Sequence, residues 1–350
     1  MSDRQLVVNG HYVGQQITGV QRYAIEILKK FDRDGISYTV EGPPKSFNSQ
    51  ALRHFWMQAV LPSKLNKDDL LWSPTNLGPI RHPNQVVTLH DIADQLYPHW
   101  YSKQYVTWRK FFLPKLLDRV KGVITVSEYS RKTIEDRFPQ AKGKVTVIEN
   151  GINRDHFYPR TKEEMEATAL QHNLDKPFAI SVGTLDPRKN IEGVIKAWHA
   201  LPEKVRREMD LVILGGQADI FSFNLNFEFD SSVRFLGYVD HEHLPQLYSK
   251  SEFFVYPSLF EGFGLPILEA MACKTPVITS NNTSLKDLAN GNALSVDPKQ
   301  TESITEAMLS LIESAELGDQ LAESGFKHAQ SYSWDKTAKE TFKLFDRMLS

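Results

Sequence analysis

Short apolar runs alternate with amphipathic stretches along the whole chain. These runs occupy residues 5–8, 85–89, 123–126, 145–148, 178–182, 211–214, 253–256 and 276–279. Runs of this length, separated by helical patterns, are typical of buried parallel strands joined by crossover helices. The pattern therefore predicts an α/β protein built on parallel sheets.

The polarity of the chain changes near residues 159–176. A charged segment, 160–167, is followed by a new apolar run that opens at Phe178. We therefore predict two doubly wound, Rossmann-like domains, an N-terminal one over residues 1–172 and a C-terminal one over 173–331. Ligand sites in such sheets lie beyond the carboxyl ends of the strands, and we expect the two sets of strand ends to face each other across a cleft.

The end of the chain, residues 332–350, has apolar positions at roughly helical spacing. They are Trp334, Ala338, Phe342, Phe345 and Leu349. This period predicts an amphipathic helix over residues 334–349.

Composition narrows the functional classes. The 350 residues exceed one ordinary domain, since a prior of about 150 residues per domain gives two. The formal net charge of −2 gives no electrostatic case for a nucleic-acid-binding protein. Cys273 is the only cysteine, which excludes a disulfide framework and a thiolate metal cluster. Neither a signal-peptide pattern nor an apolar stretch of ~18 residues is visible, so we expect a cytoplasmic protein without a spanning helix.

Two carboxylates bracket a glycine-rich turn after the apolar run 253–256. Glu261 begins the sequence EGFGLPILE, Gly262 and Gly264 lie inside it, and Glu269 ends it within a predicted helix. The glycines let the backbone approach a ligand closely, and N–H groups at a helix start favour an anionic or hydroxyl-rich ligand. Carboxylates accept hydrogen bonds from paired sugar hydroxyls. The alternative is an ordinary loop with Glu269 on a solvated helix face.

A second loop carries adjacent cations. Gly183 and Thr184 follow an apolar run, and Arg188 and Lys189 precede a predicted helix. Arg grips phosphate with its planar fork and Lys adds a point charge. The loop therefore suits a diphosphate ligand. The alternative is two solvated charges on an exposed loop.

The first half has a candidate site of its own. His90 and Asp91 lie just past a buried apolar run, where parallel sheets place ligand contacts. Histidine accepts or donates a proton near neutral pH, and an aspartate can orient it. The alternative is a loop histidine, with Asp91 capping the following turn. Gly19 and Arg22 lie in a predicted loop, 16–23, where a glycine would bring the backbone close to a phosphate or an acceptor.

Two further patterns resemble metal motifs, and we discount both. The sequence HEH at 241–243 is too compact for a helical ligand pair and follows a predicted strand, so surface histidines are expected. The sequence DRD at 32–34 follows an amphipathic helix rather than a core strand. The stretch 97–121, which mixes aromatic and basic residues, is read as an amphipathic core helix with a solvated basic face or, alternatively, as a surface for peripheral membrane contact.

The carboxylate pair resembles the Glu-x7-Glu signature of the glycosyltransferases of family 4, which are retaining, use nucleotide sugars and have the GT-B fold. The flanking sequences YPS at 256–258 and KTPVI at 274–278 match that family too. The resemblance implies two Rossmann-like domains, with the last helix crossing back to the N-terminal one. It also implies that no metal is required, because Arg and Lys neutralise the phosphates.

The resemblance assigns roles in the C-terminal domain. Glu269 would hold the ribose hydroxyls, and Glu261 would contact the transferred sugar or stabilise positive charge near its anomeric carbon. Lys189 would match the phosphate-binding lysine of the family. Many members have an arginine where this chain has Thr184, and Arg188 would supply that missing charge. The other donor contacts that the resemblance implies are Gly183, Gly237, Tyr238, Ser258, Gly262, Phe263, Gly264 and Leu265.

In the N-terminal domain the resemblance favours a catalytic role for His90, assisted by Asp91, because the family often has a histidine near the donor sugar and the incoming hydroxyl. It also has a loop comparable to that of Gly19 and Arg22, after its first strand. The sequences TGVQRY at 18–23 and DPRKN at 186–190 look most like bacterial mannosyltransferases of surface-polysaccharide assembly.

We therefore favour GDP-mannose as the donor, a saccharide or polyprenyl-linked saccharide as the acceptor, and retained anomeric configuration. The expected location is the cytoplasm, at the inner face of the cytoplasmic membrane if the peripheral contact is real. UDP-glucose and UDP-N-acetylhexosamine stay open as donors. The alternative from another class is a non-catalytic nucleotide-sugar-binding protein.

Overall fold

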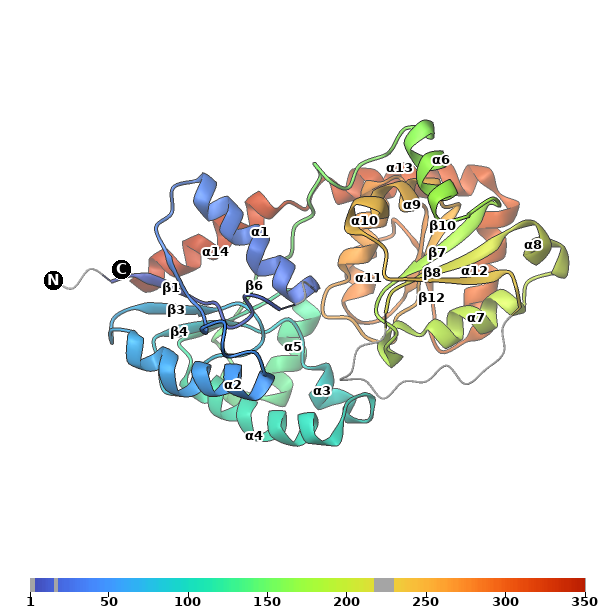
Figure 1. The fold of residues 1–350 in the computed structure, drawn as a ribbon. Coiled ribbons are helices and arrows are strands. Elements are labelled where there is room, and N and C mark those ends of the chain that lie inside the picture. Colours follow the sequence, from blue (N-terminus) through green and yellow to red (C-terminus); the bar gives the residue numbers. More distant parts are fainter. Residues whose placement is uncertain (1–3, 16–17, 217–229, 350) are drawn as a thin grey trace. The chain divides into compact units, whose positions relative to one another are not determined.

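The computed structural model describes residues 4–15, 18–216 and 230–349. Among these residues the chain forms two compact units, each with a parallel sheet of its own (Figure 1). The first unit comprises the chain up to Leu96, Val106–Gly151 and the segment from Ser333 onward. The second comprises Tyr97–Tyr105 and Ile152–Tyr332.

The described strands of the first unit form one parallel sheet in the order β2-β1-β3-β4-β5-β6. They are β1 (Leu6–Asn9), β2 (Thr39–Glu41), β3 (Leu70–Ser73), β4 (Gln85–Thr88), β5 (Gly122–Thr125) and β6 (Val145–Val147). The helices are α1 (Gly19–Arg33), α2 (Gln50–Phe55), α3 (Ala93–Leu96), α4 (Lys103–Arg119), α5 (Glu128–Arg137) and α14 (Trp334–Leu349), with a π-helical turn η1 (Trp56–Val60) and 3-10 turns η2 (Leu61–Lys64) and η4 (Pro139–Ala141).

The second unit repeats this plan, with the strand order β12-β11-β10-β7-β8-β9 and parallel pairing throughout its described strands. The strands are β7 (Phe178–Val182), β8 (Asp210–Leu214), β9 (Val233–Gly237), β10 (Phe253–Tyr256), β11 (Val277–Ser280) and β12 (Leu294–Val296). The helices are α6 (Lys162–Gln171), α7 (Ile191–His199), α8 (Glu203–Glu208), α9 (Leu244–Lys250), α10 (Leu265–Ala272), α11 (Thr283–Ala289), α12 (Thr301–Glu313) and α13 (Ala315–Ala329), with 3-10 turns η3 (Pro98–Trp100), η5 (Pro187–Lys189) and η6 (His241–His243).

The central strands of the second sheet are covered on both faces, which explains why they appear as continuous apolar runs. Buried side chains of α7 and α12 pack on one face, for example Trp198 and Met308 against Leu211 and Val255. Helices α9, α10 and α13 lie over the other face (Figure 1). The strand order reverses between β7 and β10, so the loops that leave these neighbours diverge and open the crevice where doubly wound sheets bind ligands.

The predicted α/β fold and its parallel strands are confirmed, with small shifts at the strand ends. The apolar runs missed β2, β3, β9 and β12, and β9 was expected only as the strand before residues 241–243. Strands β2 and β12 have only three residues each and lie at sheet edges, where part of each strand is exposed and the apolar signal is weak. Strand β3 is fully buried but has only four residues and follows a charged segment.

Helix α1 begins earlier than the sequence indicated, because Thr18 caps it rather than ending a loop. The Thr18 N–H donates to Gln21 Oε1 at 3.0 Å, and the two residues form a reciprocal capping box. Gly19 and Arg22 therefore lie in the first helical turn. Residues 16 and 17 of the predicted loop lie outside the described part of the chain.

Residues 152–172, which we assigned to the N-terminal domain, lie in the second unit. Helix α6 packs on α9, and the Arg160 N–H just before it donates to Ser249 Oγ at 3.2 Å. The final helix α14 packs in the first unit against α1 (Figure 1). Its Phe342 and Phe345 rings lie edge-on to Phe31 at 6.0 and 6.4 Å between centroids.

Candidate active site

The loops after β7 and β10 bring together an opposite-charge pair at the crevice of the second sheet. Lys189 Nζ lies 2.6 Å from Glu261 Oε1, and both side chains are about nine-tenths buried. Tyr256 joins them, because its hydroxyl donates to Glu261 Oε1 at 2.9 Å and accepts from Lys189. Burial, and secondly the Glu261 charge, raises the pKa of Tyr256 well above its usual value, so the hydroxyl keeps the proton that it donates.

The neighbouring cation, Arg188, pairs with a different carboxylate, that of Asp186. Arg188 makes a bidentate contact with Asp186, with Nε–Oδ1 at 3.1 Å and the second nitrogen 3.2 Å from Oδ2. Thr184 Oγ1 donates to the same carboxylate at 3.0 Å. Burial raises the pKa of Asp186, but the charges of Arg188 and Lys189 outweigh it and leave the pKa below its usual range. Arg188 is thus paired with a carboxylate of its own loop, so a phosphate would have to compete with Asp186 for the guanidinium.

The glycine-rich turn is fixed by its backbone and by Ser284. Gly264 caps α10 with φ 108°, a conformation that favours glycine, and a Cβ there would lie 2.4 Å from a methyl carbon of Leu285. Ser284 Oγ donates to the carbonyls of Glu261 and Phe263 at 2.9 and 3.0 Å. Leu265 then opens α10, and the first N–H groups of a helix have no partner within it, which favours an anionic ligand there.

Glu269 lies in α10 and is half-buried. The Tyr248 hydroxyl donates to Glu269 Oε2 at 3.5 Å, the long limit of a hydrogen bond. Ser258, in the loop before Glu261, is fully buried, and its hydroxyl has no hydrogen-bond partner among the described residues. An orphaned buried hydroxyl requires an explanation, and a ligand in this loop would provide one.

The remaining donor-side candidates lie next to strand ends or in the glycine-rich turn. Gly183 follows β7 next to the Lys189 stem, and a Cβ built on Gly183 would be 3.4 Å from Lys189 Cε. Gly237 ends β9, and its carbonyl accepts from the Gly215 N–H at 2.7 Å. Tyr238 follows it and is 73% exposed, so its ring is accessible to a ligand. Gly262 and Phe263 are buried within the turn.

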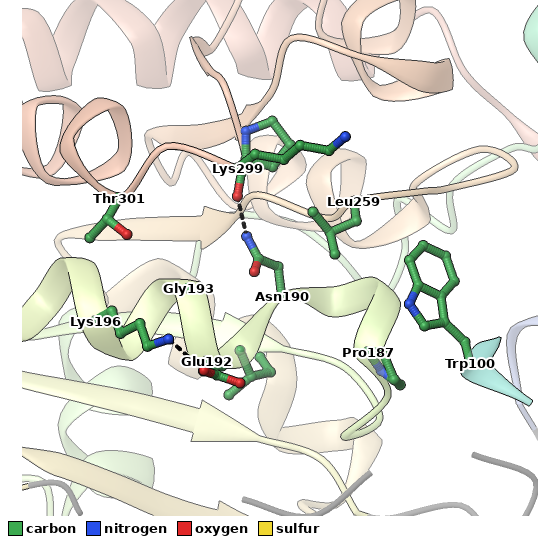
Figure 2. A pocket seen from close by; sticks show the side chains of 11 residues that line it. Trp100, Pro187, Asn190, Glu192, Gly193, Lys196, Leu259, Lys299 and Thr301 are labelled. Carbon is green, nitrogen blue, oxygen red and sulfur yellow. Dashed lines mark hydrogen bonds and ion pairs between the residues drawn. The ribbon is translucent and has the colours of Figure 1, made fainter. Parts of the chain in front are cut away.

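A cavity of about 480 Å³ lies beside the donor-side loops (Figure 2). The start of α7, the segment 298–301 and Trp100 line it. Asn190 holds these walls together, because its Nδ2 donates to Pro298 O at 2.7 Å and to Pro257 O at 3.2 Å. The described residues that line the cavity do not include Lys189 or Glu261, so the cavity adjoins the predicted donor site without being it.

In the first unit, His90 follows β4 and is held from several sides. Its Nε2 lies 3.1 Å from Pro74 O, its N–H donates to Asn76 Oδ1 at 2.7 Å, and its carbonyl accepts from Ser130 Oγ at 3.2 Å. A carbonyl only accepts, so Nε2 carries the hydrogen and Nδ1 is the acceptor of the neutral ring. Burial lowers the pKa of His90 more than Pro74 and Asp91 raise it.

Asp91 behaves as the structural alternative predicted. Its Oδ1 accepts from the Ala93 N–H at 3.0 Å and so caps the short helix α3. Its charge acts on the neighbouring His90 by raising that pKa. The hydrogen bonds that orient His90 come from Pro74, Asn76 and Ser130.

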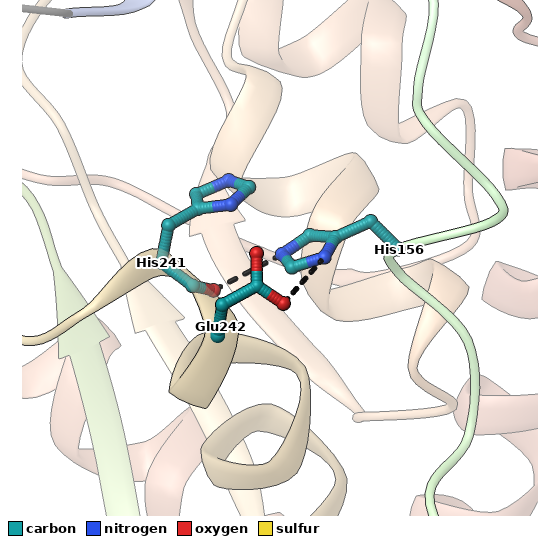
Figure 3. A group of neighbouring side chains, drawn as sticks. All are labelled: His156, His241 and Glu242. Atoms are coloured by element: carbon teal, nitrogen blue, oxygen red, sulfur yellow. Dashed lines mark hydrogen bonds and ion pairs between the residues drawn. The ribbon is translucent and has the colours of Figure 1, made fainter.

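The HEH turn at 241–243, which we discounted as a metal motif, lies next to His156, a residue far from it in sequence. His156 Nε2 lies 3.0 Å from His241 O, and its Nδ1 lies 3.8 Å from Glu242 Oε2 (Figure 3). Possible ligand atoms of the three side chains all lie within 4.8 Å of one another. The rings of His156 and His241 stack at 4.1 Å with an interplanar angle of 6°. Imidazole lone pairs lie in the ring plane, so this stack must open before both rings can bind one ion.

Comparison with known proteins decides the family. The chain matches the family described as "Glycosyl transferases group 1" over residues 162–328 and "Glycosyltransferase Family 4" over residues 42–156. It is 32% identical over 284 residues to the O-antigen chain mannosyltransferase B of Escherichia coli, covering 80% of this chain and 74% of that protein. The chain belongs to glycosyltransferase family 4.

Other relatives agree with this membership. The glycosyltransferase is 29% identical over 253 residues to the O-antigen chain mannosyltransferase RfbU of Salmonella typhimurium, covering 71% of this chain and 66% of that one. Its fold is similar to that of WaaG, a glycosyltransferase involved in lipopolysaccharide biosynthesis. The TM-score is 0.74 at 17% identity, over 96% of this chain and 98% of WaaG. The protein is thus a glycosyltransferase with the GT-B fold.

Sequence reasoning missed several residues at these sites. Tyr256 was read only as the end of a buried strand, and Asp186 only as part of a loop sequence. Arg109, which we grouped with the basic residues of the stretch 97–121, is instead buried in an ion pair with Asp94. The apolar residues of α4 join the core of the first unit. Within the described residues of this glycosyltransferase, every helix is too short or too polar to cross a membrane.

Proposed function

We propose that this glycosyltransferase transfers a mannosyl group from GDP-mannose to a saccharide or lipid-linked saccharide acceptor during surface-polysaccharide synthesis. The names of its relatives support mannose and a polysaccharide product. The observation that carries the site assignment is the buried Lys189–Glu261 pair at the crevice between β7 and β10. The pair would supply a cation for the diphosphate beside a carboxylate for the sugar.

The pair suggests how the donor is handled. A diphosphate that enters the crevice competes with Glu261 for the Lys189 ammonium, which then neutralises the leaving group as the glycosidic bond breaks. The displaced carboxylate of Glu261 becomes available to stabilise positive charge at the anomeric carbon. The N–H groups at the start of α10 contribute further partial positive charge toward the phosphates.

Other residues would fix the donor and the acceptor. Glu269 would accept the ribose hydroxyls, while Tyr248 restrains its carboxylate from behind. Tyr238 and Gly237 would lie against the base. His90, neutral at physiological pH because burial lowers its pKa, would accept a hydrogen bond at Nδ1 from a sugar hydroxyl.

The anomeric configuration would be retained, with the diphosphate leaving and the acceptor hydroxyl attacking on the same face of the sugar. The C–O bond to the diphosphate breaks, the new C–O bond forms, and the acceptor proton passes to the departing diphosphate. We place the reaction in the cytoplasm, at the inner face of the membrane if the acceptor is lipid-linked. It requires no metal, because Lys189 and the helix start neutralise the leaving group.

A thermal-shift panel of GDP, UDP, ADP and their sugars, each with and without EDTA, tests this proposal. A ligand that binds only the folded state raises the melting temperature by mass action. We expect GDP and GDP-mannose to stabilise the protein selectively, with shifts that EDTA leaves unchanged. Selective stabilisation by UDP-sugars would overturn the mannose assignment and keep the enzyme class. If no nucleotide raised the melting temperature, the assignment of a donor site would be wrong.

An assay of sugar transfer distinguishes an enzyme from a non-catalytic nucleotide-sugar-binding protein. Release of GDP from GDP-mannose, with methyl α-mannoside as acceptor and then with water alone, is the appropriate assay. Binding without transfer or slow hydrolysis would favour the binding protein.

A further inference from the structure

A network outside the predicted site residues reaches His90 through the β3–β4 connection. Asn76 lies in this connection with φ 63°, and its side-chain Oδ1 accepts the His90 N–H at 2.7 Å. Two residues earlier, Pro74 O accepts from the imidazole Nε2 at 3.1 Å. One short turn therefore holds both the backbone and the ring of His90.

Hydrogen bonds to the backbone N–H and carbonyl of Asn76 hold this turn in place. The Asn76 N–H donates to Thr88 O at 3.0 Å, which ties the turn to the end of β4. The Asn76 carbonyl accepts from a terminal guanidinium nitrogen of Arg109 at 3.0 Å. Asparagine tolerates a positive φ better than most residues, because its short polar side chain bonds locally. The residue type thus matches both the backbone conformation and the contact to His90.

Arg109 is held in turn by a buried carboxylate. Its Nε and second terminal nitrogen each lie 3.2 Å from an oxygen of Asp94, and the two side chains are 2% and 5% exposed. Asp94 belongs to α3, the short helix that Asp91 caps, while Arg109 comes from α4. A buried fork of this kind has one strongly preferred geometry. The pair therefore fixes the Asn76 carbonyl relative to the segment that carries His90.

We infer that Asn76, anchored by the Arg109–Asp94 pair, is a positioning residue that holds His90 in the orientation needed for transfer. This inference rests on the proposed function, because it gives His90 a role in the reaction. Asn76 and the pair act through His90, and the network leaves the donor-binding loops of the second unit untouched.

Two substitutions of Asn76 separate its backbone conformation from its hydrogen bond to His90. Asn76→Gly keeps the positive φ and removes the acceptor for the His90 N–H, whereas Asn76→Asp keeps an acceptor at the same place. Gln58→Ala is the matched control, because Gln58 anchors the same connection through Gly78 O at 2.9 Å and the Ile80 N–H at 3.1 Å without contacting His90. Arg109→Lys tests the fork, since lysine cannot make the bidentate contact.

The first readout is the turnover of GDP-mannose with methyl α-mannoside. We expect kcat to fall about ten- to a hundredfold in Asn76→Gly, since small misplacements of a reacting group have effects of this size. Asn76→Asp should recover most of the rate, and Arg109→Lys should fall in the same direction. The Kd for GDP should be unchanged in every variant, because the nucleotide contacts lie in the second unit.

The second readout is the titration of the His90 ring by NMR, assigned with His90→Gln. Tyr23 packs edge-on against this ring at 4.8 Å and Asp91 is the neighbouring charge, and both stay in place in the variants. A loosened ring should gain water, so its pKa should rise toward the ordinary value in Asn76→Gly and not in Gln58→Ala. A general softening of the loop would affect both variants alike.

The outcomes distinguish this inference from the proposed function. A wild-type rate and a wild-type His90 titration in Asn76→Gly would overturn the inference. Equal losses in Asn76→Gly and Gln58→Ala would also overturn it, because the effect would then belong to the loop as a whole. A shifted titration with an unchanged rate would support the positioning contact and refute the role of His90 in the reaction.

Discussion

At the scale of single residues, the central feature is a pair of buried opposite charges that neutralise each other. Lys189 and Glu261 are 12% and 10% exposed, so separating them without a ligand would leave two poorly solvated charges. The hydroxyl of Tyr256 bridges the pair and keeps its proton. A diphosphate that binds Lys189 would therefore have to replace the negative charge of Glu261 beside it.

Because Lys189 and Glu261 are paired, substitutions of the two residues should have different effects on the Kd for GDP. Lys189→Ala should raise the Kd for GDP about tenfold or more, since a hydrogen bond to a charged group contributes roughly 1.5–3 kcal/mol. Glu261→Gln should keep or tighten GDP binding, because the competing carboxylate charge is gone. It should nevertheless lower transfer about a hundredfold, because charge at the anomeric carbon loses its partner. Calorimetric titration with GDP and a steady-state transfer assay measure the two effects.

Lys196 provides the matched control for the lysine substitution. It lies on α7 in an exposed pair with Glu192, 2.5 Å between the charged atoms, so Lys196→Ala should leave the GDP affinity unchanged. An equal loss of affinity in both lysine variants would show that Lys189 has no specific role. Weaker GDP binding in Glu261→Gln would contradict the competition between the carboxylate and the diphosphate.

At the scale of elements, the turn between β10 and α10 depends on one backbone conformation. Gly264 adopts φ 108°, and Leu285 of α11 occupies the space where a side chain would begin. Ser284, next to Leu285, holds the carbonyls on both sides of Gly262. The packing of α11 and the shape of the candidate phosphate-binding turn are therefore linked.

Gly264→Ala should consequently destabilise the second unit and weaken donor binding together. The expected loss is about 2–4 kcal/mol, from backbone strain of roughly 1–3 kcal/mol and overpacking against Leu285. Gly19→Ala is the contrast, since no described atom lies within 4 Å of the added Cβ and the position is helical. Its stability should stay constant or rise by about 0.5–1 kcal/mol. Urea unfolding of both variants checks the difference, and similar losses would contradict it.

Sequence patterns predicted the elements better than the contacts between them. The strands 178–182 and 253–256 and the final helix were placed correctly, because their apolar periodicity extends over enough residues to define a buried face. The pairing of Arg188 with Asp186 was not foreseen. Adjacent residues in a loop give no periodic signal, and the direction of a side chain there depends on the fold around it. Asn76 and Arg109 were missed because they lie far apart in sequence and meet only in the folded unit.

At the scale of the whole molecule, the two units have separate cores and differ in their buried titratable groups. The first unit buries His11 and His90, and burial is the largest cause of the lowered pKa of each ring. His11 lies after β1, where its Nδ1 is 3.2 Å from Thr75 Oγ1 and the nearby Arg53 charge lowers the pKa further, to about 4. The first unit should therefore lose stability as the pH falls and its unfolded chain takes up these protons.

His11 allows this sensitivity to be tested. Its pKa is about 6.5 in the unfolded chain and about 4 in the folded one, so below the unfolded value the unfolded chain binds a proton that the folded unit rejects. The stabilising contribution is complete above pH 6.5 and declines as the pH falls toward 4. Between about pH 7.5 and about pH 5 it amounts to roughly 2 kcal/mol. His11→Gln, which cannot titrate, should be less sensitive to pH by that amount in urea unfolding followed by tryptophan fluorescence. An equal decline in both proteins would assign the acid sensitivity to other groups, of which His90 is the first to examine because it is buried in the same unit.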